Sequence, residues 1–140
     1  MSSESIENEA AGPGATASGR PRPEPVGVLP PDGVLLVLST VGTPEAAEVI
    51  ARTLLDERLI ACANLLPGCQ SIYRWQGVVE SANETLVLFK TTRNRYRAFE
   101  ERLRALHPYE LPEIVTLSPD AVLPAYSAWV IGETRRRLAR

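Results

Sequence analysis

The side chains best able to bind a metal ion are few in this chain. His107 is its only histidine, and Cys62 and Cys69 are its only cysteines. Imidazole and thiolate are side chains that suit copper and zinc, and Glu110, three residues after His107, adds a carboxylate. The sequence therefore offers His107, Cys62 and Glu110 as candidate metal ligands, and His107 is the best of the three.

Each of these candidates also has a structural interpretation. His107 precedes Pro108, which disfavours helical geometry in the residue before it, so the histidine is expected at a helix C-terminus, bonding the last carbonyls. Cys62 lies in a strand between two alanines and is expected to pack as a small hydrophobic residue. Glu110 is expected to be a solvated carboxylate. The metal-binding and structural interpretations both stay open.

Three further side chains are candidates for lining a ligand cleft. Tyr109 lies next to the candidate ligands in the sequence, and Trp75 offers a ring that can stack on a ligand. Lys90 offers a charge that can neutralise an anion. Packing against another subunit is an alternative for Trp75, because aromatic residues are enriched at such contacts.

A long hairpin over residues 60–92 dominates the elements that must position these residues. Its strands meet at Gln76-Gly77, and its return leg ends in an apolar run, residues 86–89, of the kind that favours a pleated surface. Ordinary strands have about five or six residues, so this hairpin is expected to project beyond a small sheet. The poorly buried side chains at its far end would be Tyr73, Trp75, Val78 and Val79. An exposed apolar edge aggregates or finds a partner, so these four residues are predicted to form the interface of an oligomer.

The rest of the chain supplies the other elements of an α+β fold. Residues 33–41 form an apolar run typical of a central strand. Thr43 and Pro44 begin a helix that ends near Arg58. A second helix is predicted over residues 94–106, a short strand over 113–118 and a last helix from Pro124. The order is the ferredoxin-like split βαβ pattern (β-α-β-β-α-β plus a C-terminal helix), with an antiparallel sheet whose first and third strands are central.

Composition divides the chain into a tail and a domain. Residues 1–32 are expected to be a disordered tail rich in Pro, Gly, Ala and Glu, because they hold six of the twelve prolines and few bulky apolar residues. Residues 33–140 are expected to be the folded domain, and their formal net charge of +1 lacks the positive excess usual in nucleic-acid binding.

The sequence carries no sign of export or membrane insertion. The start lacks the pattern of a targeting peptide, no stretch is apolar enough to span a bilayer, and two cysteines make no disulfide framework. A soluble cytoplasmic protein is expected.

Several blocks of this sequence resemble the CutA family of divalent-cation-tolerance proteins. The matching blocks are ACANLLPG (61–68), SIYRW (71–75) with Gly77, LFKTT (88–92), HPYE (107–110) and PEI (112–114), together with Trp129. The resemblance covers about residues 34–134 and implies a ferredoxin-like subunit assembled as a tight trimer through its long hairpins. It also implies an association with tolerance to copper and other divalent metals, with copper or another divalent cation as the bound ion.

The chain departs from the family pattern at two positions. Some members proposed to bind copper carry a cysteine in the first strand, where this chain has Ser39, and a second histidine before the HPY motif, where it has Leu106. Of these proposed ligands only His107 carries over. A metal site would therefore need three subunits to converge, or a contribution from Cys62 or Glu110.

Two hypotheses for function follow. The leading one is a trimeric, non-enzymatic protein of metal response and tolerance that binds copper or a related divalent cation, with neither a nucleic-acid nor a membrane partner. The alternative is a PII-like small-ligand sensor or a trimeric scaffold or anchoring module, because PII-type signalling proteins are also trimers of ferredoxin-like subunits. An enzyme is not expected, since one histidine, no nucleophile elbow and no phosphate loop leave few groups for catalysis.

Overall fold

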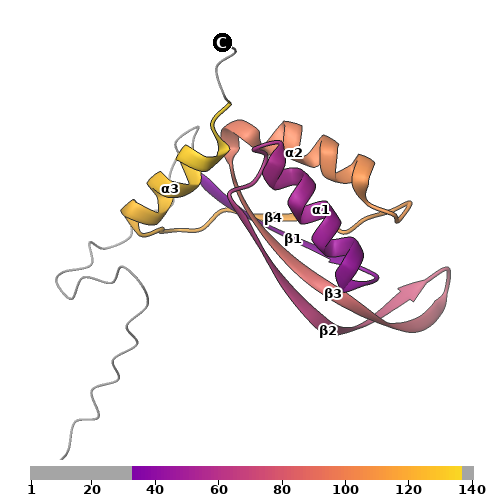
Figure 1. Ribbon diagram of the computed structural model, residues 1–140. Helices are drawn as coiled ribbons and strands as arrows, with labels where there is room; N and C mark the ends of the chain where they lie inside the picture. Colours follow the sequence, from indigo (N-terminus) through magenta and orange to yellow (C-terminus); the bar gives the residue numbers. More distant parts are fainter. Residues whose placement is uncertain (1–32, 137–140) are drawn as a thin grey trace, which may run out of the picture.

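The domain is an α+β fold built on one antiparallel sheet. The computed structural model describes residues 33–136, so the tail predicted over residues 1–32 lies outside the described residues. The four strands have the order β2-β3-β1-β4 (Figure 1). The elements, in chain order, are β1 (Val34–Val41), α1 (Pro44–Asp56), β2 (Cys62–Trp75), β3 (Val78–Thr92), α2 (Arg93–Leu106), β4 (Val115–Leu117) and α3 (Pro124–Thr134). The predicted ferredoxin-like topology is confirmed, with β1 and β3 in the centre.

Two helices cover one face of this sheet. α1 and α2 lie together on the same side of the strands (Figure 1), above alternate side chains of β1 and β3 such as Val37 and Phe89, which are fully buried. Phe89 meets Phe99 of α2 edge to face, with ring centroids 5.4 Å apart. α1 begins as predicted, because the Thr43 hydroxyl accepts a hydrogen bond from the amide of Ala46 (3.2 Å). This layer is the hydrophobic core of the domain.

The hairpin of β2 and β3 extends past the two helices (Figure 1). It stays paired from Cys62 opposite Lys90 to Trp75 opposite Val78, with one irregularity between Leu66 and Cys69. A two-residue turn joins the strands, and both of its residues are left-handed: Gln76 has φ 49° and Gly77 has φ 80°, as a type I′ turn requires. The side chains at the far end are exposed as predicted: Tyr73 by 41%, Trp75 by 45%, Val78 by 58% and Val79 by 60%.

The second face of the sheet is apolar and only partly covered. α3 covers one end of it, where Val130 packs with Val34 and Ala61. The rest of this surface, here called the open face, consists of Leu36, Leu38, Leu66, Leu86, Leu88, Val115 and Leu117, none of which is fully buried. β4 is shorter than the strand predicted over residues 113–118, with three residues paired to β1. No helix in residues 33–136 is both long and apolar enough to cross a membrane.

Candidate functional site

His107 joins the end of α2 to the end of β1. α2 ends at Leu106, and the extended backbone of His107 (φ −73°, ψ 133°) closes it through a hydrogen bond to the carbonyl of Leu103. The amide of Tyr109 donates to Nδ1 of the imidazole (3.0 Å), so Nδ1 is an acceptor. The proton is therefore on Nε2, which donates to the carbonyl oxygen of Thr40 (2.8 Å).

This arrangement occupies both nitrogens of the only imidazole. His107 is buried, with 6% of the residue exposed, and the centroid of its ring lies 4.7 Å from that of the Tyr109 ring. Its partner is a carbonyl of β1, whereas the sequence predicted the last carbonyls of the helix. A metal ion at this ring would have to displace the Tyr109 amide or the Thr40 carbonyl.

Tyr109 is fixed from its other end by a buried carboxylate. Its hydroxyl donates to Oε2 of Glu84 (2.7 Å), and Glu84 is only 8% exposed. Burial first, then the hydrogen bond and the charge of Glu84, raise the pKa of Tyr109 to about 12. The hydroxyl also lies over Gly42, where an added Cβ would be 3.3 Å away. His107 and Glu84 together hold the Tyr109 ring in one place.

The held tyrosine forms part of a groove of about 600 Å³ between the HPY segment and the outer half of the hairpin. The lining has an apolar and aromatic part, with Tyr73 and Trp75 from the hairpin and Leu111 from the segment after His107. The acidic residues of the lining are Glu80, Glu84, Glu110 and Glu113, and the lining has no lysine or arginine. We call this surface the acidic groove. Four carboxylates with no basic neighbour in the lining produce a negative potential that attracts cations.

The three candidate metal ligands are not brought together within the chain. Glu110 lines the acidic groove, close to His107. Cys62 is opposite Lys90, which is opposite Leu36 of β1, whereas His107 bonds to Thr40. Leu36 and Thr40 are four residues apart along β1, so Cys62 and His107 lie at positions of the sheet that are about 13 Å apart. Among the described residues, no three His, Cys, Asp or Glu side chains gather as a metal site requires.

Cys62 and Lys90 have local partners at the other end of the sheet. The Cys62 thiol is half-buried and lies 3.5 Å from the hydroxyl of Tyr126 in α3, and the Lys90 ammonium donates to the side-chain carbonyl of Asn64. Of the three residues predicted to line a ligand cleft, Tyr109 and Trp75 share the acidic groove, and Lys90 is not part of its lining.

The sequence pointed to Glu110 alone among the four groove carboxylates and missed Glu80, Glu113 and, most consequentially, the buried Glu84. A glutamate in the polar half of a long strand reads as solvated, and nothing near it in the sequence indicates that a tyrosine hydroxyl 25 residues away will cover it. Its one signal is its position two residues before the apolar run of residues 86–89.

Comparison with known proteins identifies the family. Residues 35–133 match the sequence model of the CutA1 divalent ion tolerance protein family. The divalent-cation tolerance protein CutA of Thermus thermophilus is 52% identical over 82 residues, which are 59% of this chain and 80% of that protein. Its counterpart from Pyrococcus horikoshii is 38% identical over 103 residues, 74% of this chain and all of that protein. The crystal structure of CutA from Xylella fastidiosa superposes with a TM-score of 0.71 at 43% identity, covering 73% of this chain and 98% of that one. The chain therefore belongs to the CutA1 divalent ion tolerance protein family.

Proposed function

We propose that this protein is a homotrimeric, non-enzymatic component of divalent-cation tolerance that binds copper or a related divalent cation. The observation that carries the proposal is the acidic groove, in which four glutamates and no basic side chain line a cavity of about 600 Å³. Relatives are named divalent-cation tolerance proteins, which supports the same class of ion. We also propose a cytoplasmic location, which the two free cysteines support.

Two uncovered apolar surfaces support the homotrimer. One is the open face, where Leu66, Val115 and Leu117 are 45%, 48% and 49% exposed. The other is the far end of the hairpin, with Trp75 and its three neighbours. Contiguous exposed apolar surface marks interaction sites, and a closed ring of three copies lets each hairpin lie against the next subunit. The far end of the hairpin also forms one wall of the acidic groove, so assembly would enclose that groove.

We place the bound ion in the acidic groove, with Glu110 as a ligand. The carboxylates of one described subunit do not gather tightly enough to hold an ion alone, so the site is completed by groups of the adjoining subunit. Oxygen ligands select poorly among divalent metals compared with imidazole and thiolate, and the expected binding is weak and broad. In this proposal His107 supports the site indirectly, because it holds the Tyr109 ring that lines the groove. It becomes a direct ligand only if the Tyr109 amide no longer donates a hydrogen bond to Nδ1.

Calorimetric titration of copper into the full-length protein tests this site. Wild type is expected to bind, Glu110→Gln to bind more weakly, and Glu101→Gln, which removes an exposed carboxylate of α2, to match wild type. His107→Ala separates the two roles of the histidine: loss of all heat with the fold and trimer retained makes it a ligand, and partial weakening makes it a support.

Two results would overturn the proposal. One is an absence of binding heat with wild type. The other is an isotherm for Glu110→Gln that is the same as that of wild type, because the groove would then not hold the ion. Circular dichroism and the mass of each variant in solution show whether a loss of binding comes from a loss of structure.

A further inference from the structure

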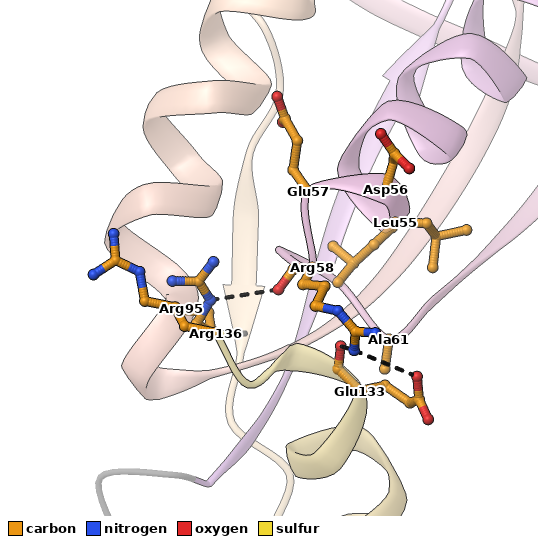
Figure 2. A pocket seen from close by; sticks show the side chains of 9 residues that line it. Leu55, Asp56, Glu57, Arg58, Ala61, Arg95, Glu133 and Arg136 are labelled. Atoms are coloured by element: carbon orange, nitrogen blue, oxygen red, sulfur yellow. Dashed lines mark hydrogen bonds and ion pairs between the residues drawn. The ribbon is translucent and has the colours of Figure 1, made fainter. Parts of the chain in front are cut away.

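We propose that a second cavity, at the opposite end of the sheet, binds the phosphate group of a small anion through the guanidinium groups of Arg58, Arg95 and Arg136. The cavity measures about 590 Å³ and lies where the C-terminal ends of α1 and α3 meet the first turn of α2. Figure 2 shows Arg95 and Arg136 on one side of it and Arg58 with Glu133 on the other. It shares no residue with the acidic groove, so this inference does not depend on the proposed function.

Arg58 is held in a backbone conformation that a glycine would adopt more easily. The amide of Arg58 bonds to the carbonyl of Leu55 (3.0 Å) and the amide of Leu59 to that of Leu54 (2.9 Å), which is the Schellman pattern of a helix end. The left-handed residue of that pattern is usually glycine, and here it is Arg58, with φ 57°. Strain of this kind is concentrated at functional sites, and it points to a use for the Arg58 side chain.

The Arg58 guanidinium reaches across the cavity to the end of α3. Its NH1 group lies 3.4 Å from the carbonyl oxygen of Glu133 and 4.0 Å from the Glu133 carboxylate. Both contacts are at the outer limit for a hydrogen bond or an ion pair. A long contact of this kind leaves donors of the guanidinium free for another acceptor.

Arg95 and Arg136 face the same space without an acidic partner. Nε of Arg95 donates to the carbonyl oxygen of Arg58 over 3.4 Å, drawn as a dashed line in Figure 2. Burial and the nearby charge of Arg136 lower the pKa of Arg95. Among the described residues, no carboxylate lies within ion-pair distance of either arginine. An anion between the two guanidinium groups would remove this repulsion.

The acidic residues of the lining form no ion pair with Arg95 or Arg136. Both carboxylate oxygens of Glu57 accept from Nε of Arg102, each at 2.9 Å, and Glu133 is paired with Arg58. Asp56 is the remaining carboxylate of the lining. In addition, the first turn of α2 has no acidic residue and no side-chain cap, so the positive end of its dipole adds to the field. The cavity therefore favours an anion.

The chemistry of the donors indicates phosphate. A guanidinium group presents paired N–H donors that match two oxygens of one phosphate. Arg95 and Arg136, which have no ion-pair partner among the described residues, can together neutralise a doubly charged anion, and Arg58 adds hydrogen-bond donors. The volume is in the range of small-molecule sites, about 300–1,000 Å³. It leaves room for more than a free phosphate, so both inorganic phosphate and a phosphorylated metabolite fit the same donors.

Isothermal titration with inorganic phosphate and with AMP, in chloride buffer of constant ionic strength, tests the site. Wild type is expected to bind at least one of the two saturably. AMP binding more tightly than phosphate indicates a phosphorylated metabolite, and equal or weaker binding indicates the free anion. Arg95→Gln is expected to weaken binding about tenfold or more, because a charge-assisted hydrogen bond is lost.

The variant Arg58→Gly separates an effect on anion binding from an effect on stability. Glycine accepts the left-handed conformation without strain, so this variant is expected to have a higher thermal unfolding midpoint than wild type without ligand, yet to bind phosphate or AMP at least about tenfold more weakly. Arg104→Gln, a matched loss of an exposed arginine in the last turn of α2, is expected to bind like wild type. The site is overturned if wild type shows no saturable binding, or if Arg58→Gly and Arg95→Gln both bind as tightly as Arg104→Gln does.

Discussion

At the scale of single residues, His107 shows how a residue with metal chemistry can have a positioning role. Its Nε2 proton and Nδ1 lone pair are both used within the fold, and the result is a fixed Tyr109 ring. Tyr109 in turn supplies the donor that satisfies the buried Glu84 carboxylate. The HPY segment therefore forms a fixed part of the wall of the acidic groove.

The Tyr109–Glu84 hydrogen bond predicts a change in stability at alkaline pH. The pKa of Tyr109 is raised from 10.0 to about 12 in the fold, so folding favours the neutral phenol. This contribution is fully present below pH 10 and is lost as the pH rises through about 12. Tyr109→Phe is expected to be less stable than wild type at neutral pH by about 2 kcal/mol, because Glu84 loses its donor.

Unfolding midpoints of wild type and Tyr109→Phe between pH 8 and pH 12 check this prediction. The two curves are expected to approach each other above pH 10. Tyr126, whose pKa is also raised to about 12, titrates in both proteins and does not affect the comparison. A constant difference across the whole range would contradict the assignment.

Ser39 is a polar residue inside the core. It is fully buried on the helix-covered face of β1, opposite Val87, and its hydroxyl has no hydrogen-bond partner among the described residues. A buried hydroxyl without a partner is destabilising. Position 39 therefore points into the hydrophobic core and away from both cavities.

Ser39→Ala is expected to raise the free energy of unfolding by about 1 kcal/mol, because it removes this unpaired hydroxyl. Urea denaturation at a fixed protein concentration measures the change. Ser81→Ala, at an exposed hydroxyl that accepts from Gln70 over 3.3 Å, is the control, with little change expected. A loss of stability in Ser39→Ala would show that the hydroxyl has a partner.

At the scale of elements, the path of the hairpin depends on its two-residue turn and on the bulge in β2. The left-handed residues Gln76 and Gly77 reverse the chain within two residues, and Gly68, with φ 79°, allows the irregularity between Leu66 and Cys69. A bulge of this kind increases the local twist of a strand. The outer half of the hairpin can therefore turn toward the HPY segment and form the groove.

The strain at Gln76 provides a test of this turn. A non-glycine residue in the left-handed conformation costs about 1 kcal/mol, so Gln76→Gly is expected to stabilise the protein by about that amount. Gln70→Gly, the same change within a strand, is expected to destabilise it. Equilibrium unfolding of both variants checks the pair, and destabilisation by Gln76→Gly would contradict the type I′ geometry.

At the scale of the whole molecule, the domain has one covered and one partly uncovered sheet face. α1 and α2 bury the first (Figure 1), and the open face keeps its leucines only partly buried. The proposed homotrimer would cover this surface and the hairpin ends together. The expected mass in solution is therefore three times the 15.3 kDa of one chain.

Leu38→Lys, in the middle of the open face, is expected to dissociate the trimer, because an ammonium group cannot be buried between apolar surfaces without a partner. Val49→Lys is the matched control, since Val49 is 64% exposed on α1 and faces away from the open face. Light scattering measures both masses. A trimeric Leu38→Lys, or a monomeric wild type in dilute solution, would remove the open face from the interface.

The sequence by itself determined the order of elements, the turn at Gln76-Gly77 and the exposure of the hairpin end. These follow from local signals: Thr43 and Pro44 at a helix start, Pro108 at a helix end, and a hairpin too long for its sheet. Only the tertiary structure decided what surrounds His107, because the Thr40 carbonyl that it bonds is 67 residues away. The same holds for the cavity of Arg58, Arg95 and Arg136, whose side chains come from three helix ends. Backbone geometry depends on neighbours in the chain, whereas a side chain's partners depend on contacts between distant segments, which no local pattern encodes.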